Sequence, residues 1–334
     1  MMWLTLRPGE QSIGFSPGDN LLDTLLRADV PIAYSCLAGQ CGSCRCKLHE
    51  EQVADGYTEQ GRGARVVLAC QTSLSGPCIV EIPEPDEIVV HPACILKGMG
   101  DSIEAPVEDV RIIRFRTNRS LAFSPGQFAN IRFAPGLERS YSMASVADEN
   151  LLEFHIRIVP DGSASAFVAN DLGVGDTVRI SGPLGTSYLR RKHEGPSICI
   201  GGGTGLAPVL SIARGSLEAG NQHPIHLYFG VRSQADIYGT EQLADLKRRF
   251  PNLVVHVVVA NGPASECYRT GRITDVIAAD WQGSDALAEF RGYVCGSPPM
   301  IDAVRDILVD RGLAEDWIYA DAFFNQSDAQ AQPA

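Results

Sequence analysis

Four cysteines near the start of the chain restrict its fold more than any other feature. Cys36, Cys41 and Cys44 form a C-x4-C-x2-C run, and Cys70 follows in the segment Val-Leu-Ala-Cys-Gln. This spacing is typical of plant-type [2Fe–2S] proteins, in which four thiolates bind two irons. The two glycines inside the run let the backbone curve around a cluster and direct N–H groups at its sulfurs. The sequence therefore predicts one [2Fe–2S] cluster held by these four cysteines.

Other uses of these cysteines fit the sequence less well. A zinc site would need a second Cys-x-x-Cys or a histidine pair, and only Cys70 lies suitably downstream. A disulfide framework suits small secreted chains, and core thiols separated by glycines would be unusual. Cys46 and Cys78 are near enough to compete as ligands, but the spacing favours the four cysteines named first.

The composition is that of a globular protein with more than one domain. Its 334 residues allow two or three cores, and 45% hydrophobic and 20% charged residues are ordinary values. The net charge of −12 argues against binding to nucleic acid or to an anionic membrane surface.

The sequence favours a cytoplasmic location. Its first residues lack the charged and apolar regions of a signal peptide, and ten cysteines without such a signal favour a reducing compartment. The uncharged stretch 195–213 is long enough to span a membrane, but its glycines and prolines favour a buried strand, a tight loop and a helix. We therefore expect no membrane segment there.

Residues 1–98 are predicted to form the first domain. Residues 3–15 alternate in polarity and break at Pro8-Gly9, which predicts a hairpin. Asp19 or Asn20 then caps a short helix that carries leucines at helical spacing. After Cys70, a strand ends in a proline-rich acidic segment, and this stiff segment through about residue 98 is the expected boundary.

Residues 99–192 are predicted to form a small antiparallel barrel with one helix. Segments 107–117, 128–134 and 151–159 have the pattern of strands. The turn 162–165 precedes a helix whose N-terminal N–H groups suit a phosphate. Such a barrel can hold a ligand at its rim.

Residues 193–324 alternate between strand and helix, which predicts a parallel sheet with its ligand at the carboxyl ends of the strands. Strands are expected at 197–200, 224–231, 252–260, 292–295 and 317–324, and helices at 206–217, 240–249 and 299–311. Residues 325–334 form a polar tail that is expected to be disordered.

The turn 201–205 reads Gly-Gly-Gly-Thr-Gly between a strand and a helix, as a phosphate-binding loop does. It departs from the G-x-G-x-x-G fingerprint, so a turn that is glycine-rich for packing remains an alternative. Another strand ends in Cys295-Gly296, and two such strand ends make a crevice for a dinucleotide. Arg232 would favour a 2′-phosphate and Asp236 a free 2′-hydroxyl, which leaves the choice between NADH and NADPH open.

A second group of polar residues lies in the barrel segment. Arg139, Tyr141 and Ser142 offer a guanidinium for phosphate, a ring for stacking and a hydroxyl for a heterocycle nitrogen. A surface arginine beside a strand explains the first of them equally well. His155 and Arg157 share one face of a later strand, where a histidine is more often a core or rim residue than a ligand.

Together these motifs resemble the ferredoxin–NADP reductase superfamily with a fused plant-type ferredoxin domain, and in detail the reductase components of naphthalene-type Rieske dioxygenases. The stretches that carry the resemblance cover almost the whole chain: Tyr34–Cys44, Phe123–Phe128, Ser140–Ala144, Ser181–Thr186, Gly201–Ser211, Tyr228–Gln234 and Tyr319–Phe323. The resemblance implies a β-grasp fold for the first domain, an FAD-binding barrel for the second and an NAD(P)-binding α/β fold for the third.

The resemblance also implies individual roles. Arg139 would hold the FAD phosphate, Tyr141 would stack on the isoalloxazine, and Ser142 would lie at flavin N5. The turn from Gly162 through Ser163 to Ser165 would bind the flavin pyrophosphate. The remaining expected cofactor contacts are Ser140, His155, Arg157, Gly202, Gly203, Thr204, Gly205, Pro208, Arg232 and Gly296.

At the end of the chain, Cys295 would lie near the nicotinamide C4, Asp321 would occupy the position of the active-site acid, and Phe323 would cover the flavin. Plant-type reductases have a glutamate and a tyrosine at the last two positions, so Asp321 and Phe323 depart from that pattern.

The implied function is that of an NAD(P)H:ferredoxin oxidoreductase in an aromatic-ring dioxygenase system. A hydride passes from NAD(P)H to FAD, and single electrons pass through the [2Fe–2S] cluster to a Rieske-type ferredoxin. Alternatives are a reductase that feeds a diiron monooxygenase or a deoxysugar enzyme directly, and a redox sensor without turnover. The oxygenase substrate is not encoded here, and the oligomeric state is open, with a monomer favoured.

Overall fold

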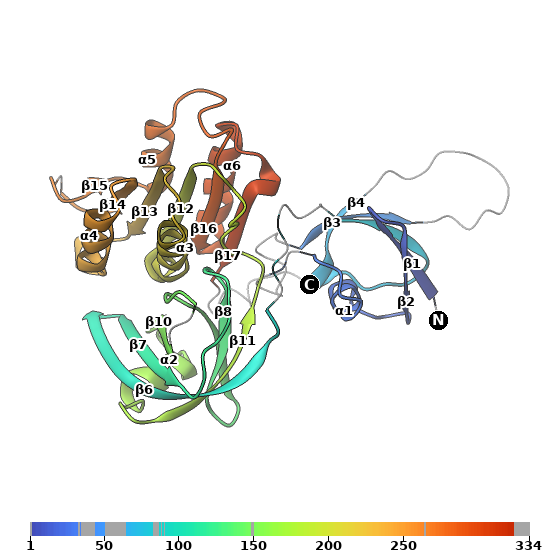
Figure 1. Ribbon diagram of the computed structural model, residues 1–334, viewed down its shortest axis with the longest axis horizontal. Coiled ribbons are helices and arrows are strands. Elements are labelled where there is room, and N and C mark those ends of the chain that lie inside the picture. The colour runs from blue at the N-terminus through green and yellow to red at the C-terminus, as the bar shows by residue number, and fades with distance from the viewer. Residues whose placement is uncertain are drawn as a thin grey trace. The chain divides into compact units, whose positions relative to one another are not determined.

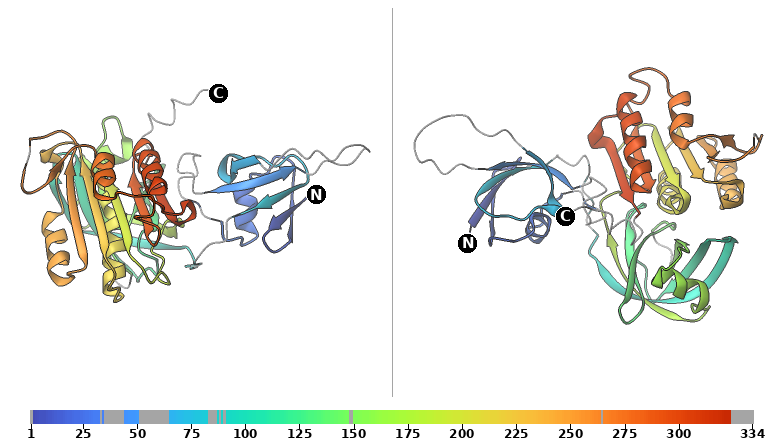
Figure 2. Two further views of the ribbon diagram at one scale, coloured as in Figure 1. Left: turned by 90° about the horizontal axis from the view of Figure 1, so that it is seen from above. Right: turned by 180° about the vertical axis from the view of Figure 1, so that it is seen from behind.

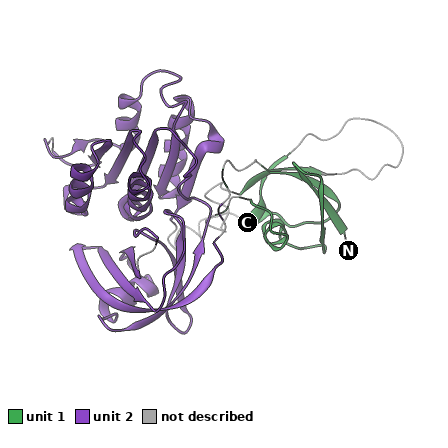
Figure 3. Ribbon diagram, viewed as in Figure 1, with its two compact units in different colours: residues 1–88 green, residues 89–334 purple. Residues whose placement is uncertain are grey.

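The computed structural model describes residues 2–32, 34, 44–50, 65–82, 87, 89, 91–147, 150–263 and 265–323. They belong to two compact units, residues 1–88 and residues 89–334, coloured separately in Figure 3. Cys36, Cys41 and the tail 325–334 lie outside the described residues.

The first unit contains a mixed sheet. Its strands are β1 (Met2–Arg7), β2 (Gln11–Phe15), β3 (Arg45–Glu50), β4 (Arg65–Leu68) and β5 (Cys78–Glu81), in the order β2-β1-β5-β3-β4. β1 and β2 are antiparallel, while β1 and β5 run in parallel. The hairpin predicted around Pro8-Gly9 is therefore confirmed.

One short helix covers the core of this sheet. It is α1 (Leu21–Arg27), and its N-cap Asn20 accepts a hydrogen bond from the backbone N–H of Asp23 (3.2 Å). Leu21, Leu22 and Leu25 are buried, which confirms the predicted helix.

The second unit begins with an antiparallel sheet that curls into a barrel (Figure 1). Its strands are β6 (Cys94–Val107), β7 (Val110–Thr117), β8 (Phe128–Ala134), β9 (Leu137–Ser142), β10 (Leu151–Arg157) and β11 (Thr177–Leu184), in the order β10-β7-β6-β11-β8-β9. The end strands approach each other, because an isolated bridge joins Met143 to Phe154. The predicted barrel is confirmed.

A single helix, α2 (Ser163–Asn170), packs against this barrel. Phe167 on its buried side lies against Phe133 of β8, with ring centroids 6.0 Å apart. The helix begins at Ser163, three residues earlier than the predicted start at Ala166.

The strand β6 corrects the first predicted boundary. It starts at Cys94 and pairs along its length with β7 and β11 of the barrel. A boundary at residue 98 would cut this strand in half. The barrel therefore starts at Cys94, and the two compact units divide between residues 88 and 89.

The rest of the second unit is a parallel sheet. Its strands are β12 (Ser197–Gly202), β13 (Ile225–Val231), β14 (Leu253–Val259), β15 (Arg269–Thr270), β16 (Arg291–Gly296) and β17 (Ile318–Ala322), in the order β15-β14-β13-β12-β16-β17. The connecting helices are α3 (Leu206–Glu218), α4 (Thr240–Arg249), α5 (Ile273–Asp280) and α6 (Pro298–Asp310). Short 3₁₀ turns are η1 (Ala69–Gln71) in the first unit and η2 (Gly203–Gly205), η3 (Gln234–Asp236) and η4 (Glu315–Trp317) here.

Helices cover both faces of the parallel sheet (Figures 1 and 2). Leu227 and Phe229 of β13 share a buried cluster with residues of α3 and α4. On the opposite face Tyr228 bonds Asp280 at the end of α5. A sheet covered on both faces explains why its strands read as nearly continuous apolar runs.

The order of the strands places a topological switch point between β12 and β16. After β12 the chain adds β13 and β14 on one side, and it later returns to add β16 and β17 on the other. In open sheets of this kind the crevice at the carboxyl ends of these strands binds ligands. The stretch 195–213 supplies β12, the glycine turn and part of α3. Within the described residues, no helix has the length and apolarity needed to cross a membrane.

Candidate functional site

The strand β9, at one end of the strand order of the barrel, carries the predicted flavin residues. β9 carries Arg139, Ser140, Tyr141 and Ser142, and it pairs on one side with β8. Tyr141 is half-buried, edge-on to Phe133 with ring centroids 6.2 Å apart, and burial raises the pKa of its phenol to about 12. Tyr141 therefore stays a neutral, planar surface, which suits stacking against a heterocycle.

The neighbouring polar residues of β9 differ in exposure. Arg139 is half-buried, and its guanidinium donates to the carbonyl of Glu138 (2.7 Å). The hydroxyl of Ser140 is exposed and donates to Oδ1 of Asn130 (2.7 Å). A guanidinium held at a barrel rim in this way fits a phosphate.

A buried hydrogen bond joins the barrel to the parallel sheet. The hydroxyl of Ser142 donates to Oδ2 of Asp321 at 2.7 Å, although the two residues are 179 positions apart in the chain. Both residues are 6% exposed. Asp321 lies on β17, where it pairs with Cys295 of β16. The bond thus connects the predicted flavin edge of the barrel with the carboxyl ends of the strands at the switch point.

The predicted nicotinamide residues lie at these same strand ends. Cys295 is fully buried, and burial together with the charge of Asp321 raises the pKa of its thiol. The thiol is therefore neutral and does not act as a nucleophile at ordinary pH. The backbone N–H of Phe323 donates to the carbonyl of Gly296 (2.8 Å), which fixes where the half-buried Phe323 leaves β17.

The glycine turn packs tightly against this strand end. A Cβ at Gly205 would lie 2.2 Å from the carbonyl oxygen of Cys295, so no side chain fits there. Gly203 has φ +57°, and a Cβ there would lie 2.9 Å from Nη2 of Arg157. Both Gly203 and Gly205 are therefore required for close packing, which was the alternative explanation for the glycines of this turn. Gly202 and Gly203 are half-buried, whereas Thr204 and Gly205 are buried, so the start of the turn is the part that a phosphate could reach. Gly202 ends β12, Thr204 lies in η2, and Pro208 lies in the first turn of α3.

The N-terminus of α2 forms a second turn with free backbone donors. Ser165 closes the turn, because its hydroxyl donates to the carbonyl of Val159 (3.1 Å) and accepts from the N–H of the same residue (3.2 Å). A Cβ at Gly162 would lie 2.5 Å from that hydroxyl. The first N–H groups of a helix, here beginning at Ser163, have no partner inside the helix and suit a pyrophosphate.

The side chains of His155 and Arg157, two of the predicted cofactor contacts, bond protein groups in the structure. His155 is buried, with its ring nitrogens 3.1 Å from Glu153 and 3.1 Å from the hydroxyl of Tyr238. Arg157 bonds Asp109 (2.5 Å). Both side chains turn toward protein groups because β10 faces the parallel sheet, and a strand pattern does not show which side of a barrel is covered by another domain.

Arg232 and Asp236, the residues expected at the coenzyme ribose, also have protein groups close to their side chains. The N–H and hydroxyl of Ser233 both donate to Oδ2 of Asp236 (2.9 Å each), which closes a capping box. The side chain of Arg232 is 73% exposed and lies 3.5 Å from Asp109. The structure therefore leaves the Arg232 guanidinium accessible, while the carboxylate of Asp236 belongs to its own turn.

In the first unit, two of the predicted cluster ligands lie beside the same strand pair. Cys44 precedes β3 and Cys70 follows β4 in η1, and the N–H of Ala69 donates to the carbonyl of Cys44 (2.9 Å). The side-chain amide of Asn20 donates to the carbonyl of Cys70 (2.9 Å). Two cysteines at the ends of one strand pair, with their backbones this close, fit ligands of a shared iron–sulfur cluster.

The competing cysteines of this unit belong to its core. Cys46 is 3% exposed and Cys78 is 5% exposed, and both lie in the hydrophobic cluster beneath the sheet, as does the expected ligand Cys44, which is 2% exposed. Burial, with the neighbouring Cys44 and Cys78, raises the pKa of the Cys46 thiol to about 12. Burial does not distinguish these two cysteines from Cys44, and the spacing of the cysteines remains the reason to expect Cys44 as the ligand.

Sequence reasoning missed three residues of this region: Glu153, Tyr238 and Asp109. Glu153 shares the face of β10 with His155 and Arg157, and three polar residues at a period of two were a usable signal. Tyr238 and Asp109 lie in connecting segments, so no periodicity marked them.

A barrel edge bonded to the switch point of a nucleotide-type sheet is the arrangement of a flavin-dependent reductase that uses a nicotinamide coenzyme. The cysteine-bearing first unit adds an iron–sulfur domain to this class. Comparison with known families agrees. Residues 4–75 match the 2Fe-2S iron-sulfur cluster binding domain, residues 101–188 the oxidoreductase FAD-binding domain, and residues 199–306 the oxidoreductase NAD-binding domain.

Comparison with individual proteins gives a narrower result. The chain is 48% identical to the naphthalene 1,2-dioxygenase system ferredoxin–NAD(P)+ reductase component of Pseudomonas putida and 49% identical to that of the naphthalene 1,2-dioxygenase/salicylate 5-hydroxylase systems of a Ralstonia species. Each match covers 97% of this chain and 99% of the relative. The chain therefore belongs to the family of iron–sulfur flavoprotein ferredoxin–NAD(P)+ reductase components.

Solved structures show the same architecture. An Amycolatopsis cytochrome P450 reductase is 29% identical, with a TM-score of 0.75 over 97% of this chain and 99% of that one. The ferredoxin reductase in carbazole 1,9a-dioxygenase is 30% identical, with a TM-score of 0.70 over 97% of this chain and 98% of that one. The three-domain fold expected from the sequence is thereby confirmed.

Proposed function

We propose that the chain is the NAD(P)H:ferredoxin oxidoreductase of an aromatic-ring-hydroxylating dioxygenase system. It takes two electrons from NAD(P)H at the FAD site and passes them one at a time through the [2Fe–2S] site to a Rieske-type ferredoxin. The observation that carries this proposal is the identity of 48% over nearly the full length of a naphthalene dioxygenase reductase component.

The described residues fit the cofactors that the family requires. Tyr141 offers a half-buried ring at the barrel rim, the turn before α2 offers backbone donors, and the glycine turn, half-buried at Gly202 and Gly203, lies beside Cys295. FAD, when bound, supplies two-electron acceptance and one-electron release, and the cluster supplies a one-electron relay.

The chain contributes orientation and a fixed hydrogen bond to this reaction. Because Asp321 accepts the proton of the Ser142 hydroxyl, the Ser142 oxygen presents its lone pairs outward from the bond. We infer that this oxygen receives a hydrogen bond from the reduced flavin ring and that Asp321 stabilises the arrangement. Ser142 and Asp321 would thereby orient the flavin for hydride transfer, and such orientation can lower the activation free energy of that step by several kcal/mol.

The end of β17 controls access to the same edge. Phe323 leaves the strand at a point fixed by its hydrogen bond to Gly296. We infer that its ring covers the flavin until the nicotinamide displaces it, which excludes water between turnovers. The neutral, buried Cys295 supplies an apolar floor for the nicotinamide and takes no proton.

Reductase components with a direct monooxygenase acceptor form a second candidate. The reductase of propane 2-monooxygenase from Mycolicibacterium goodii and that of phenol 2-monooxygenase from a Pseudomonas strain are each 28% identical to this chain over nearly its full length. The higher identity to naphthalene dioxygenase components favours the acceptor of that system, a separate small ferredoxin.

Reconstitution tests the partner. Purified holoprotein, NADH and a naphthalene-type oxygenase should oxidise naphthalene only when the Rieske ferredoxin of that system is also present. The same turnover without the ferredoxin would contradict the proposed acceptor. A parallel assay with NADPH measures the coenzyme preference that the accessible Arg232 leaves open.

A further inference from the structure

The barrel strand β10 places three polar side chains on the face that meets the parallel sheet. They are Glu153, His155 and Arg157, at successive alternate positions. Glu153 is 8% exposed and His155 is 4% exposed. Charged and polar groups buried to this degree require partners, so this face of β10 has a specific role at the contact with the sheet.

A chain of hydrogen bonds starts at Arg114 of β7. Its guanidinium contacts Oε2 of Glu153 (2.7 Å), and Oε1 of Glu153 lies 3.1 Å from Nε2 of His155. Burial alone would raise the pKa of Glu153, but the hydrogen bond from His155 and the charges of His155 and Arg114 lower it, so Glu153 is a carboxylate. It therefore accepts the Nε2 proton of His155 and fixes the orientation of the ring.

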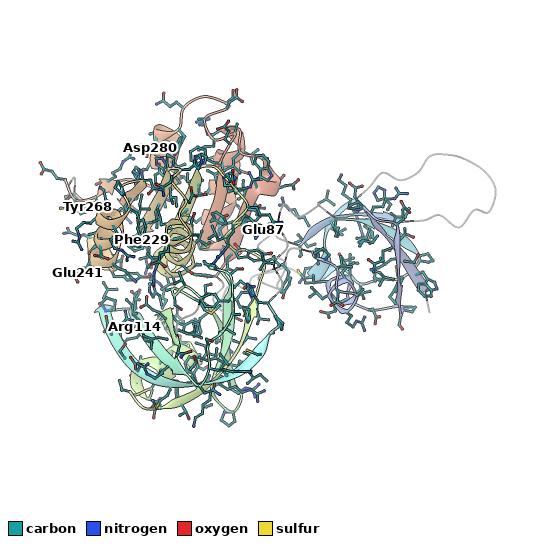
Figure 4. The ribbon with its side chains drawn as sticks, in the orientation of Figure 1. Glu87, Arg114, Phe229, Glu241, Tyr268 and Asp280 are labelled. Carbon is teal, nitrogen blue, oxygen red and sulfur yellow. The ribbon has the colours of Figure 1, made fainter. Side chains whose placement is uncertain are left out.

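The other ring nitrogen of His155 faces the parallel-sheet part of the unit. Nδ1 lies 3.1 Å from the hydroxyl oxygen of Tyr238, the residue that follows η3 and Ile237. Because the one hydroxyl proton of Tyr238 is donated to Gly203, Nδ1 donates to this oxygen, and both ring nitrogens of His155 carry a proton. The ring of Tyr238 is buried edge-on against Phe229 of β13, with centroids 5.5 Å apart. Figure 4 labels Arg114 on the barrel and Phe229 in the parallel sheet.

This chain of contacts ends on the glycine turn. The hydroxyl of Tyr238 donates to the carbonyl oxygen of Gly203 at 3.4 Å. Arg157, which is tied to Asp109 (2.5 Å), packs against the same glycine, since a Cβ at Gly203 would lie 2.9 Å from its Nη2. Two side chains thus fix a residue whose φ of +57° only glycine adopts readily.

The orientation of the Gly203 carbonyl determines that of the next N–H group. The peptide unit between Gly203 and Thr204 is planar, with its C=O and N–H pointing in opposite directions. The Gly203 carbonyl accepts the backbone N–H of Leu206 within η2, and the Tyr238 hydroxyl adds a second hydrogen bond to the same oxygen, so the N–H of Thr204 is directed away from both of these donors. That N–H belongs to the donors with which such a turn binds a phosphate.

We propose that His155 and Tyr238 are positioning residues for the nicotinamide coenzyme. They hold the Gly203–Thr204 peptide so that the glycine turn is ready to bind the pyrophosphate of NAD(P)H. This inference rests on the proposed function, because the coenzyme site is part of it. It also means that two residues of the flavin barrel, Glu153 and His155, help to position the coenzyme-binding turn of the parallel-sheet domain.

The test variant is Tyr238→Phe, which keeps the ring packed on Phe229 and removes only the hydroxyl. Calorimetric titration of the oxidised holoprotein with NAD+ should show a dissociation constant about 5-fold to 10-fold higher than that of the wild type. In ferricyanide assays the KM for NADH should rise by a similar factor, and kcat should change less than about 2-fold. A dissociation constant within 2-fold of the wild type would overturn the proposal.

A matched control separates positioning from stability. Tyr228 of the same sheet has a buried ring whose hydroxyl donates to Asp280 (2.9 Å) on the face away from the glycine turn. Tyr228→Phe should lower the thermal midpoint and leave NAD+ affinity unchanged. Equal losses of NAD+ affinity in both variants would assign the effect to general loosening and contradict positioning.

A pair of variants at His155 provides an independent test. His155→Leu removes the polar link, whereas His155→Asn keeps a polar atom near the position of Nδ1. The leucine variant should weaken NAD+ binding by about as much as Tyr238→Phe, and the asparagine variant should weaken it less. Equal NAD+ affinity in the wild type and the leucine variant would overturn the inference. A wild type that neither binds NAD+ nor oxidises NADH would instead refute the proposed function, and the inference with it.

Discussion

The Ser142–Asp321 bond shows how much of the chemistry depends on single residues. The hydroxyl has one proton, and the buried carboxylate accepts it at 2.7 Å, so the orientation of Ser142 is fixed by a residue from another domain. An aspartate at this position reaches the hydroxyl directly, although plant-type reductases have a glutamate there. The shorter side chain therefore still reaches Ser142, the residue that we propose lies at the flavin edge.

We predict that Asp321→Ala slows reduction of the bound flavin by about 10-fold to 100-fold, because Ser142 loses the acceptor that orients it. Stopped-flow absorbance at the flavin band measures this rate, and the FAD content should be unchanged. Ser142→Ala should have a similar effect, and the double variant should be little worse than either single variant. Fully additive losses would show that the two residues act independently.

A second residue-scale prediction concerns His256, which stacks on Tyr228 with ring centroids 4.3 Å apart. Burial lowers the pKa of His256 to about 4, although Asp280 opposes this shift. The folded protein therefore favours the neutral ring, and stability is complete above the unfolded pKa of about 6.5. It falls as the pH decreases from there toward 4, by about 1–2 kcal/mol once the partial exposure of the ring is allowed for.

Urea unfolding at pH 7 and pH 5 measures this loss. His256→Phe keeps the stacked ring and removes the titration, so its stability should fall less between the two pH values. His223→Gln, at an exposed histidine, provides the control and should behave like the wild type. An equal loss of stability in the wild type and the phenylalanine variant would refute the assignment.

At the scale of elements, the β12–α3 turn depends on the absence of side chains. We predict that Gly205→Ala lowers the free energy of unfolding by about 1–3 kcal/mol, because its Cβ would meet the Cys295 carbonyl at 2.2 Å. It should also abolish measurable NAD+ binding, as calorimetry would show. Gly173→Ala, where the nearest atom lies 3.5 Å away, is the control and should change neither property by much. Normal NAD+ binding by the Gly205→Ala variant would contradict the assigned turn.

The regular elements followed from the sequence wherever one pattern was unbroken. The strands and helices predicted between 197 and 260 agree with β12, α3, β13, α4 and β14 to within a residue or two. β6 was missed because Gly98 and Gly100 interrupt it, and glycines usually mark turns. Here they are required by packing, since a Cβ at Gly98 would lie 2.8 Å from Ile180 and one at Gly100 2.9 Å from the carbonyl of Gly173.

The site was less predictable than the fold. Resemblance to known reductases pointed to Ser142 and Asp321 separately, but a bond across 179 positions leaves no local pattern. Tyr238 was missed because its role depends on how the barrel meets the sheet. For the same reason, the sequence did not show that the side chains of His155 and Arg157 bond protein groups. Contacts between domains are set by tertiary packing, which a single sequence does not display.

At the scale of the whole molecule, the three domains define an order of electron flow. The flavin barrel and the parallel sheet share one compact unit, and the cysteine domain forms the other. Hydride entry therefore requires only the second unit, whereas one-electron exit to a protein acceptor requires both. This division can be tested by removing the cluster alone.

We predict that Cys41→Ser retains NADH-dependent reduction of ferricyanide, which can accept electrons at the flavin, and loses more than about 90% of cytochrome c or ferredoxin reduction, because the one-electron relay is gone. Cys267→Ser, at an exposed cysteine outside the predicted ligand set, should retain both activities. Steady-state assays with the two acceptors measure the split. Equal loss of both activities in Cys41→Ser would contradict the order of flow.

The most direct test of the central claim is an anaerobic titration of the purified holoprotein with NADH, followed by absorbance. FAD accepts two electrons and a [2Fe–2S] cluster one, so both the flavin band and the iron–sulfur band should bleach, with an end point near about 1.5 NADH per chain. Bleaching of the flavin band while the iron–sulfur band persists would contradict electron transfer from flavin to cluster. A spectrum unchanged by NADH would contradict the whole account.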